Sequence, residues 1–255
     1  MTGAMRVGES GKTHARCYVP PESWEKTDLV VSGDELHHLS RVLRVRRGDT
    51  VEIFNGRGGA GTAEVLDLDK HRAQLRPLIR EQKPPPRPAV TLVQAVIREA
   101  HMDWVVQKAV ELGASVIAPV WTTRGVVRAA ASDNRKRRWE AIVLNAARQS
   151  RAAWLPVVED PVSLPDFLAR RPRYDLFLVA ALDQATVPLR HALAVVEGAP
   201  ESVAALVGPE GDFTADELCA AREAGALAVS LGARTLRAET AALYLLSVIR
   251  HVWAA

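Results

Sequence analysis

Four prolines fall within five residues in the segment Pro84–Pro88, and this run constrains the fold more than any other feature of the chain. Proline fixes φ and has no backbone N–H, so the run cannot lie inside a helix or a central strand. It favours a stiff, extended spacer. A chain of 255 residues suits one large domain or two ordinary ones. We therefore predict two domains, over residues 14–82 and 89–255.

The sequence before the prolines predicts mostly short strands separated by Gly or Asp turns. One helix is expected at about Asp34–Arg44, where apolar residues recur near helical spacing. A small β-barrel with one helix would bury this pattern. The expected strands are His14–Val19, Thr50–Phe54, Thr62–Leu68 and Ala73–Ile79.

The part after the prolines alternates between strand and helix periods. This alternation indicates an α/β fold with a mostly parallel sheet covered by helices. Ligands of such sheets bind beyond the carboxyl ends of the strands. The expected strands are Val90–Ala95, Val116–Val120, Trp154–Val158, Leu176–Ala181, Val203–Val207 and Ala226–Ser230, and the expected helices are Met102–Leu112, Asn134–Ser150, Leu164–Arg170, Leu189–Val196, Ala215–Ala224 and Ala238–Val252.

Composition excludes several classes of protein. Apolar residues make up 48% and charged residues 25%, which is a globular balance. No apolar run approaches the roughly 18 residues of a membrane span. The two cysteines, Cys17 and Cys219, make neither a disulfide framework nor a metal site. We expect a soluble, cytoplasmic protein with no metal and no membrane association, whose first 13 residues are either a loose leader or a remnant of cloning.

The basic residues are unevenly distributed. The net charge of +3 lies wholly before the end of the proline run, where 15 Lys and Arg stand against 12 Asp and Glu. Four arginines fall within Arg41–Arg47, and eight basic residues fall within Arg124–Arg151. Such clusters are typical of proteins that bind a polyanion, although a solvated helix face would explain them equally well.

One glycine-rich match is set aside. Gly56–Gly61 fits the G-x-G-x-x-G pattern of dinucleotide-binding proteins, which needs a strand before it and a helix after it. Here a strand-like run follows the glycines. A hairpin turn is therefore expected, and a nicotinamide dehydrogenase is disfavoured.

Two loops that follow strands carry polar groups. In the first, a buried strand runs into a Gly-Pro-Glu-Gly turn at 208–211, after which Thr214 and Glu217 form the capping-box pattern of a helix start. The second loop, Leu231–Arg237, joins the last strand to the last helix, and with the first turn of that helix it carries two arginines, a carboxylate and a hydroxyl. We predict that these two loops form one composite pocket.

These loops, with three further segments, resemble the RsmE family of the SPOUT superfamily. The family consists of bacterial methyltransferases that modify N3 of a uridine in 16S ribosomal RNA. The resemblance covers roughly Ala15–Val252. It is carried by GPEGDFTADE and LGARTLRAETA in the two loops, and by His38–Arg44 with Gly48-Asp49, Gln107–Gly113, and Ala146–Ser150 with Pro156.

The resemblance implies a PUA-like β-barrel that binds RNA, followed by a SPOUT-type α/β domain with a C-terminal trefoil knot. It also implies a homodimer and, as substrate, a uridine of 16S rRNA within an assembled small ribosomal subunit. S-adenosylmethionine would sit in the knot. By the same resemblance, its contacts fall on Val207, Gly208, Gly211, Leu231, Gly232, Leu236, Arg237 and Thr240.

Three positions depart from the family pattern. Asp212 stands where the family usually has a glycine, so this loop is bulkier and more acidic. Arg98 replaces a lysine, which keeps the charge and changes its geometry. Ala152 replaces an arginine, with Arg151 one position earlier.

The chemistry that the resemblance implies needs two kinds of group. N3–H of uridine is a weak acid, so some group must remove its proton or stabilise the resulting anion. Glu210 and Glu239 are both candidates for the base; Arg237 is the expected stabiliser, with Arg16 as an alternative. Contacts with RNA are expected from Arg16, Arg41, Arg44, Arg98, Arg124 and Arg151, and from the Arg135–Arg138 cluster.

Two alternatives stay open. One is a catalytically weak RNA-binding or ribosome-assembly protein of the same fold, which Asp212 and Ala152 would motivate. The other is a SPOUT methyltransferase that acts on another RNA, such as tRNA, or at a ribose 2′-OH.

Overall fold

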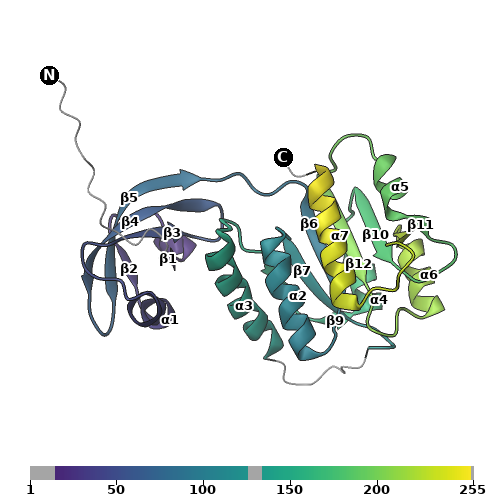
Figure 1. The fold of residues 1–255 in the computed structure, drawn as a ribbon, viewed down its shortest axis with the longest axis horizontal. Coiled ribbons are helices and arrows are strands. Elements are labelled where there is room, and N and C mark those ends of the chain that lie inside the picture. Colours follow the sequence, from purple (N-terminus) through teal and green to yellow (C-terminus); the bar gives the residue numbers. More distant parts are fainter. Residues whose placement is uncertain (1–14, 126–133, 254–255) are drawn as a thin grey trace. The chain divides into compact units, whose positions relative to one another are not determined.

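The computed structural model describes residues 15–125 and 134–253. The chain divides into two compact units, Met1–Pro84 and Pro85–Ala255, and the division falls inside the proline run (Figure 1). Three sequence-based expectations lie outside the described residues: the leader, the strand start at His14, and Arg128 of the second basic cluster.

The described part of the first unit is a five-stranded sheet with a short 3-10 turn, η1, and one longer helical segment made of α1 and η2. The sheet order is β1-β3-β4-β5-β2; β1 is parallel to β3, and the other pairs are antiparallel. Cys17, Leu29, Leu39, Ile53 and Leu75 are among its fully buried residues. The elements are β1 Arg16–Tyr18, η1 Pro21–Ser23, β2 Leu29–Val31, α1 Gly33–His37, η2 His38–Val42, β3 Thr50–Phe54, β4 Gly59–Leu68 and β5 Ala73–Gln82.

The glycine-rich segment is a hairpin connection, as expected. It joins the antiparallel strands β3 and β4, and the side chain of Asn55 accepts the backbone N–H groups of Arg57 and Gly59, each at 2.8 Å. A Cβ at Gly61 would lie 2.0 Å from the carbonyl oxygen of Ile79, so the neighbouring strand requires a glycine there. No helix follows the glycines, and a dinucleotide-binding turn is therefore excluded.

Two expectations for the first unit need correction. The single helix predicted at Asp34–Arg44 is an α-helical turn that changes into a π-helical turn, in which the Leu43 N–H bonds the His38 oxygen at 3.0 Å. The strand β2 was not predicted. Three residues are too few to display a period.

The second unit is built on an eight-stranded sheet in which every pair of strands is parallel. Its order is β11-β13-β10-β12-β6-β7-β8, with β9 beside β7. The predicted parallel sheet is confirmed. The strands are β6 Ala89–Ala95, β7 Val116–Trp121, β8 Val157–Val158, β9 Val162–Ser163, β10 Leu176–Ala180, β11 Val187–Pro188, β12 Ser202–Val207 and β13 Leu227–Ser230.

Of the helices described in the second unit, five form two packed groups (Figure 1). Helix α5 packs instead against β11 and β13. Helix α2 packs against α3 and α7, and α7 also lies on β6 and β12. Helices α4 and α6 form a separate apolar cluster with sheet residues such as Val93 and Leu206. The helices are α2 Glu99–Glu111, α3 Arg135–Ser150, α4 Leu164–Arg170, α5 Leu189–Ala194, α6 Ala215–Glu223 and α7 Ala238–Trp253.

The centre of the sheet explains where a site can form. Strand β12 is buried at five consecutive positions and β6 at six, as expected for strands covered on both faces. Because neighbouring strands are parallel, the carboxyl ends of β10, β12 and β13 meet at one edge of the sheet. The loops after these three strands are therefore brought together.

Candidate functional site

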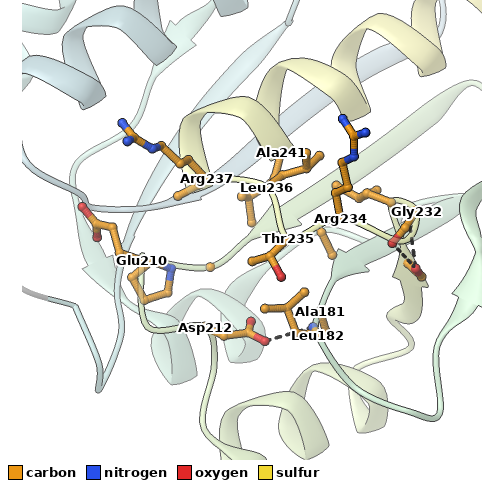
Figure 2. A pocket seen from close by; sticks show the side chains of 17 residues that line it. Ala181, Leu182, Glu210, Asp212, Gly232, Arg234, Thr235, Leu236, Arg237 and Ala241 are labelled. Atoms are coloured by element: carbon orange, nitrogen blue, oxygen red, sulfur yellow. Dashed lines mark hydrogen bonds between the residues drawn. The ribbon is translucent and has the colours of Figure 1, made fainter.

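A pocket of about 250 Å³ lies where β10, β12 and β13 end and α7 begins (Figure 2). Its walls come from the loops after these three strands and from the first two turns of α7. The predicted composite pocket of two loops is therefore present, with a third loop added. The lining residues are 180–182, 207–210, Asp212, 230–232, 234–238 and Ala241.

The loop after β12 is braced by its capping box. Thr214 begins α6: its side chain accepts the Glu217 N–H at 3.2 Å, and the Glu217 carboxylate accepts the Thr214 N–H at 2.9 Å. The capping box that the sequence predicted is confirmed. Burial opposes the ionisation of Glu217, but hydrogen bonds from Thr214 and Thr123 outweigh it and lower the pKa of the carboxyl below its ordinary value.

Arg124, in the loop after β7, holds the same loop from another side. Its guanidinium donates to the carbonyl oxygens of Gly211 and Phe213, both at 3.1 Å. A Cβ at Gly211 would lie 3.3 Å from the Cβ of Arg124. Gly211 therefore serves close packing against Arg124, and it is not among the residues that line the pocket.

The loop after β13 supplies the mixed polar wall. Gly232 has a φ of +122°, a region that favours glycine, and its N–H bonds the Ser230 hydroxyl at 3.3 Å. Figure 2 shows Thr235 in the middle of the lining, and Arg234 and Arg237 on opposite sides of it. Both arginines are exposed. The wall therefore offers two cations to a ligand.

Six of the eight residues expected to contact a cofactor line the pocket: Val207, Gly208, Leu231, Gly232, Leu236 and Arg237. Gly211 and Thr240 do not; Thr240 is exposed on α7. Sequence reasoning missed the wall after β10, formed by Ala180, Ala181 and Leu182. The rule that ligands bind beyond strand ends, applied to the strand at Leu176–Ala181, was the signal that pointed there.

The two candidate bases have different surroundings. Glu210 is exposed and lines the pocket. Glu239, in the first turn of α7, is only 8% exposed and does not line it. Its Oε2 is buried and has no hydrogen-bond partner among the described residues. Arg237, the expected stabiliser, lines the pocket on the same side as Glu210 (Figure 2).

The arginines expected to contact RNA fall into two groups. Arg41 and Arg44 are exposed in the first unit, and Arg98 and Arg151 are exposed in the second. Arg16, in contrast, is only 6% exposed. Its Nε lies 3.9 Å from Oε2 of Glu52, and its Cζ lies 4.1 Å from the centre of the Phe54 ring. These surroundings do not suit the RNA contact or the anion-stabilising role expected of Arg16.

Most of the Arg135–Arg138 cluster is engaged within the protein. Arg135 lies over the Trp121 ring, Lys136 pairs with Asp160 at 2.8 Å, and Arg138 pairs with Glu99 and Asp103. These contacts tie α3 to the neighbouring elements. Arg124 is likewise engaged with two carbonyl groups, so its guanidinium has a structural role.

A hollow of about 740 Å³ lies on the first unit, between the helical segment α1–η2 and the turn from β4 to β5. Arg41 lines one side of it, and Lys70 and His71 line the other. The one carboxylate in the lining, Asp69, accepts the N–H groups of His71 and Arg72. The hollow thus combines exposed cations with a carboxylate that already has partners.

Neither a membrane span nor a metal site is found within 15–125 and 134–253. None of the helices there is both long and apolar enough to cross a bilayer. The same residues contain no group of three or more His, Cys, Asp or Glu side chains arranged to hold a metal ion.

Comparison with known proteins gives consistent matches to both units. Residues 83–250 match the RNA methyltransferase domain family, and residues 31–78 match the RNA methyltransferase PUA domain family. The PUA-like character expected of the first unit is thereby confirmed.

Two named relatives cover most of the chain. Ribosomal RNA small subunit methyltransferase E of Mycobacterium tuberculosis is 36% identical, over 86% of this chain and 85% of the relative. The protein of that name from Synechocystis is 33% identical, over 89% and 74%.

Two solved structures are also similar. A methyltransferase from Legionella pneumophila in complex with SAM has a TM-score of 0.86 at 29% identity, covering 96% of this chain and 99% of that one. Ribosomal RNA small subunit methyltransferase E from Neisseria gonorrhoeae, bound to S-adenosyl methionine, has a TM-score of 0.83 at 33% identity, covering 94% and 98%.

Proposed function

The chain belongs to the ribosomal RNA small subunit methyltransferase E family, and from this membership we propose that it transfers a methyl group from S-adenosylmethionine to N3 of a uridine in 16S rRNA. The observation that carries the proposal is the pocket at the ends of β10, β12 and β13. Its cofactor class is supported by the relatives with S-adenosylmethionine bound.

The residues of the pocket fit this cofactor. Val207, Leu231 and Leu236 provide apolar surface for an adenosine group, and Gly208 allows backbone to approach a ligand closely. Asp212 offers negative charge, and two arginines offer positive charge. A ligand with an ammonium, a carboxylate and a sulfonium matches this mixed set of charges.

The bound cofactor would supply a methyl group on a positively charged sulfur; the protein must prepare the acceptor. We assign the base to Glu210, because its carboxylate is exposed in the pocket lining, whereas that of Glu239 is buried away from it. Glu210 would take the proton from N3–H. Arg237 would stabilise the negative charge that then develops on O2 and O4.

Contact with RNA is assigned to the exposed arginines. Arg41 and Arg44 in the first unit, with Arg98 and Arg151 in the second, would contact phosphates. The hollow beside Arg41 supports this role for the first unit, which we propose as an RNA-binding domain over 14–82. Residues 89–255 are proposed as the methyltransferase domain. The trefoil knot implied by the family resemblance stays a prediction.

A homodimer is proposed from two exposed aromatic side chains. Trp104 on α2 is 42% exposed and Tyr244 on α7 is 43% exposed. The two helices are in contact, so both rings lie on one pair of packed helices. A second copy would cover this apolar surface.

A uridine buried in folded rRNA must be exposed before reaction, so we propose the assembled small subunit as the substrate. We propose the cytoplasm as the location.

The experiment that tests the function combines a deletion with a reconstituted reaction. Mass-spectrometric mapping of rRNA from a deletion strain should show one uridine that lacks its N3 methyl group. The purified protein should restore it on small subunits from that strain when S-adenosylmethionine is added. Binding of S-adenosylmethionine without methyl transfer to subunits or free rRNA would favour a catalytically weak RNA-binding protein. A methyl group missing from tRNA or from a ribose would identify another substrate.

A further inference from the structure

Asp212 has a strained backbone and bridges two loops of the pocket. Its φ is +58°, in the left-handed region, which glycine adopts most readily and which aspartate adopts more often than most other residues. Oδ2 accepts the N–H of Leu182 at 2.9 Å, and Oδ1 accepts the N–H of Phe213 at 2.8 Å. Figure 2 shows the first of these bonds crossing from the loop after β12 to the loop after β10.

The left-handed φ of Asp212 is not explained by a role of its side chain within the turn alone. A glycine would adopt this φ at lower cost, because Cβ is what disfavours the left-handed region. The bond to Phe213 is local and can help an aspartate tolerate the conformation. The bond to Leu182 joins residues 30 positions apart, so it does not serve the turn itself. The side chain therefore has a task that glycine cannot perform.

That task concerns the segment after β10. Leu182 lines the pocket and is 68% exposed, so its side chain is available to a ligand. The next residue, Asp183, accepts the Ala185 N–H at 2.6 Å and pairs with Arg222 of α6 at 3.1 Å. The segment is thus attached at two successive residues, and Asp212 provides the attachment that is nearest the pocket.

The other side of the same turn is held independently. Arg124 donates to the carbonyl groups of Gly211 and Phe213, which flank Asp212 in the sequence. Asp212 therefore has an anchored backbone from which its carboxylate can hold the Leu182 segment.

We propose that Asp212 is a positioning residue that latches the Leu182 segment over the pocket, so that this wall is formed before the cofactor arrives. The inference rests on the proposed function, because it takes the pocket as the site of S-adenosylmethionine. A wall that is already ordered does not have to be ordered on binding, and affinity gains accordingly. Leu182 would then bury its exposed side chain against the apolar part of the ligand.

The test is calorimetric titration of S-adenosylmethionine into the full-length protein. We expect Asp212→Ala and Asp212→Gly to weaken binding by about tenfold, which is the order of one hydrogen bond with loop ordering. Asp212→Asn retains one acceptor oxygen and should lose less. Asp216→Asn removes a neighbouring exposed carboxylate on α6 that does not line the pocket, and it should bind as the wild type does.

Asp212→Gly separates positioning from stability. Glycine relieves the left-handed φ but removes the two hydrogen bonds of the side chain, and these effects on stability have opposite signs, so the thermal midpoint of this variant should stay near that of the wild type while the affinity falls. In steady-state assays Asp212→Gly should raise KM for the cofactor and leave KM for RNA unaltered. A midpoint that falls together with the affinity would assign Asp212 to folding alone and overturn the proposal.

A double-mutant cycle tests the route through Leu182. Leu182→Ala keeps the backbone N–H and removes the apolar side chain, so it should weaken binding on its own. Combined with Asp212→Ala it should add little, because an unlatched segment no longer presents the side chain. Full additivity would overturn the latch. If the wild type itself fails to bind S-adenosylmethionine, the proposed function fails; if it binds and the Asp212 variants bind equally well, only this inference fails.

Discussion

The carboxylate of Glu217, in the first turn of α6, accepts the backbone N–H of Thr123 at 2.7 Å and so joins this helix to the loop after β7, 94 residues earlier in the chain. The same carboxylate completes the capping box of α6. One side chain thus begins the helix after β12 and fixes the loop after β7, where Arg124 in turn holds the pocket loop. The pocket depends on this chain of contacts outside its own lining.

Glu217→Gln should lower the free energy of unfolding by about 1–3 kcal/mol at pH 7, because the amide keeps only one acceptor oxygen: one of the two charge-assisted bonds becomes a weaker neutral bond, and the other N–H loses its acceptor. The pKa of Glu217 is lowered in the folded protein, since the hydrogen bonds from Thr214 and Thr123 outweigh burial. Its stabilisation is therefore full above the ordinary glutamate pKa of about 4.3 and is lost as the pH falls through the folded value. Urea denaturation at several pH values measures both effects.

The difference in the free energy of unfolding between Glu217→Gln and the wild type should shrink as the pH falls. Asp216→Gln, an exposed position in the same helical turn, serves as the control and should change stability little. A Glu217→Gln penalty that stays constant from pH 7 to pH 3 would contradict the role given to the ionised carboxylate.

Glu210→Gln should reduce methyl transfer by about 10²–10⁴-fold, the usual contribution of a general base, while leaving the cofactor bound. Glu239→Gln is the matched change at the other candidate and should keep turnover within a few-fold, because Glu239 is buried outside the pocket lining. Single-turnover rates and calorimetric titration distinguish chemistry from binding. The opposite result would move the base to Glu239, and normal rates in both variants would rule out a carboxylate base.

The pair Arg41→Ala and Arg44→Ala should weaken RNA binding and lower the slope of log K against log salt by about 1 for each arginine. Both residues are exposed, and no ion pair of either is found among the described residues. Arg170→Ala is the control, because this arginine lies near Asp166 on α4. Filter binding between low and moderate salt provides the measurement. A salt slope equal to that of the wild type would exclude these arginines from the RNA surface.

Arg250→Met should destabilise the second unit by about 1–3 kcal/mol, since two carbonyl groups lose their donor. Arg250, near the end of α7, donates to the Pro88 oxygen at 2.9 Å and also to the Gly113 oxygen. It therefore joins the start of β6 to the end of α2. Denaturant titration, with Arg170→Met on the surface as the reference, tests this; equal stability of the two variants would contradict it.

Tyr244→Glu should convert a dimer into a monomer at micromolar concentration, because it places a charge on the proposed apolar interface. The reference is Val195→Glu, at a 78% exposed valine directly after α5. Light scattering coupled to size-exclusion chromatography gives the mass of each. A wild-type protein that is monomeric would refute the dimer.

The elements that could be predicted are those long enough to display a period. Strand Thr50–Phe54 and helix Leu164–Arg170 have the expected bounds, and α7 differs by one residue. The strand expected at Trp154–Val158 is only Val157–Val158, and β2, β9 and β11, of two or three residues each, were not predicted. Such short strands are defined by their hydrogen-bonding neighbours and not by their own residues.

The sequence by itself determined the parallel sheet, the two loops that form most of the pocket and the capping box at Thr214, because each follows from local periodicity or local chemistry. Only the tertiary structure decided which charged residues face a ligand. Glu210 and Glu239 could not be ranked as the base from sequence. Arg16, Arg41 and Arg124 were equal candidates for contact with RNA. In the structure Arg16 is buried, Arg124 holds a pocket loop and Arg41 is exposed. Burial and pairing depend on contacts between residues far apart in the chain, and those contacts exist only once the elements have packed.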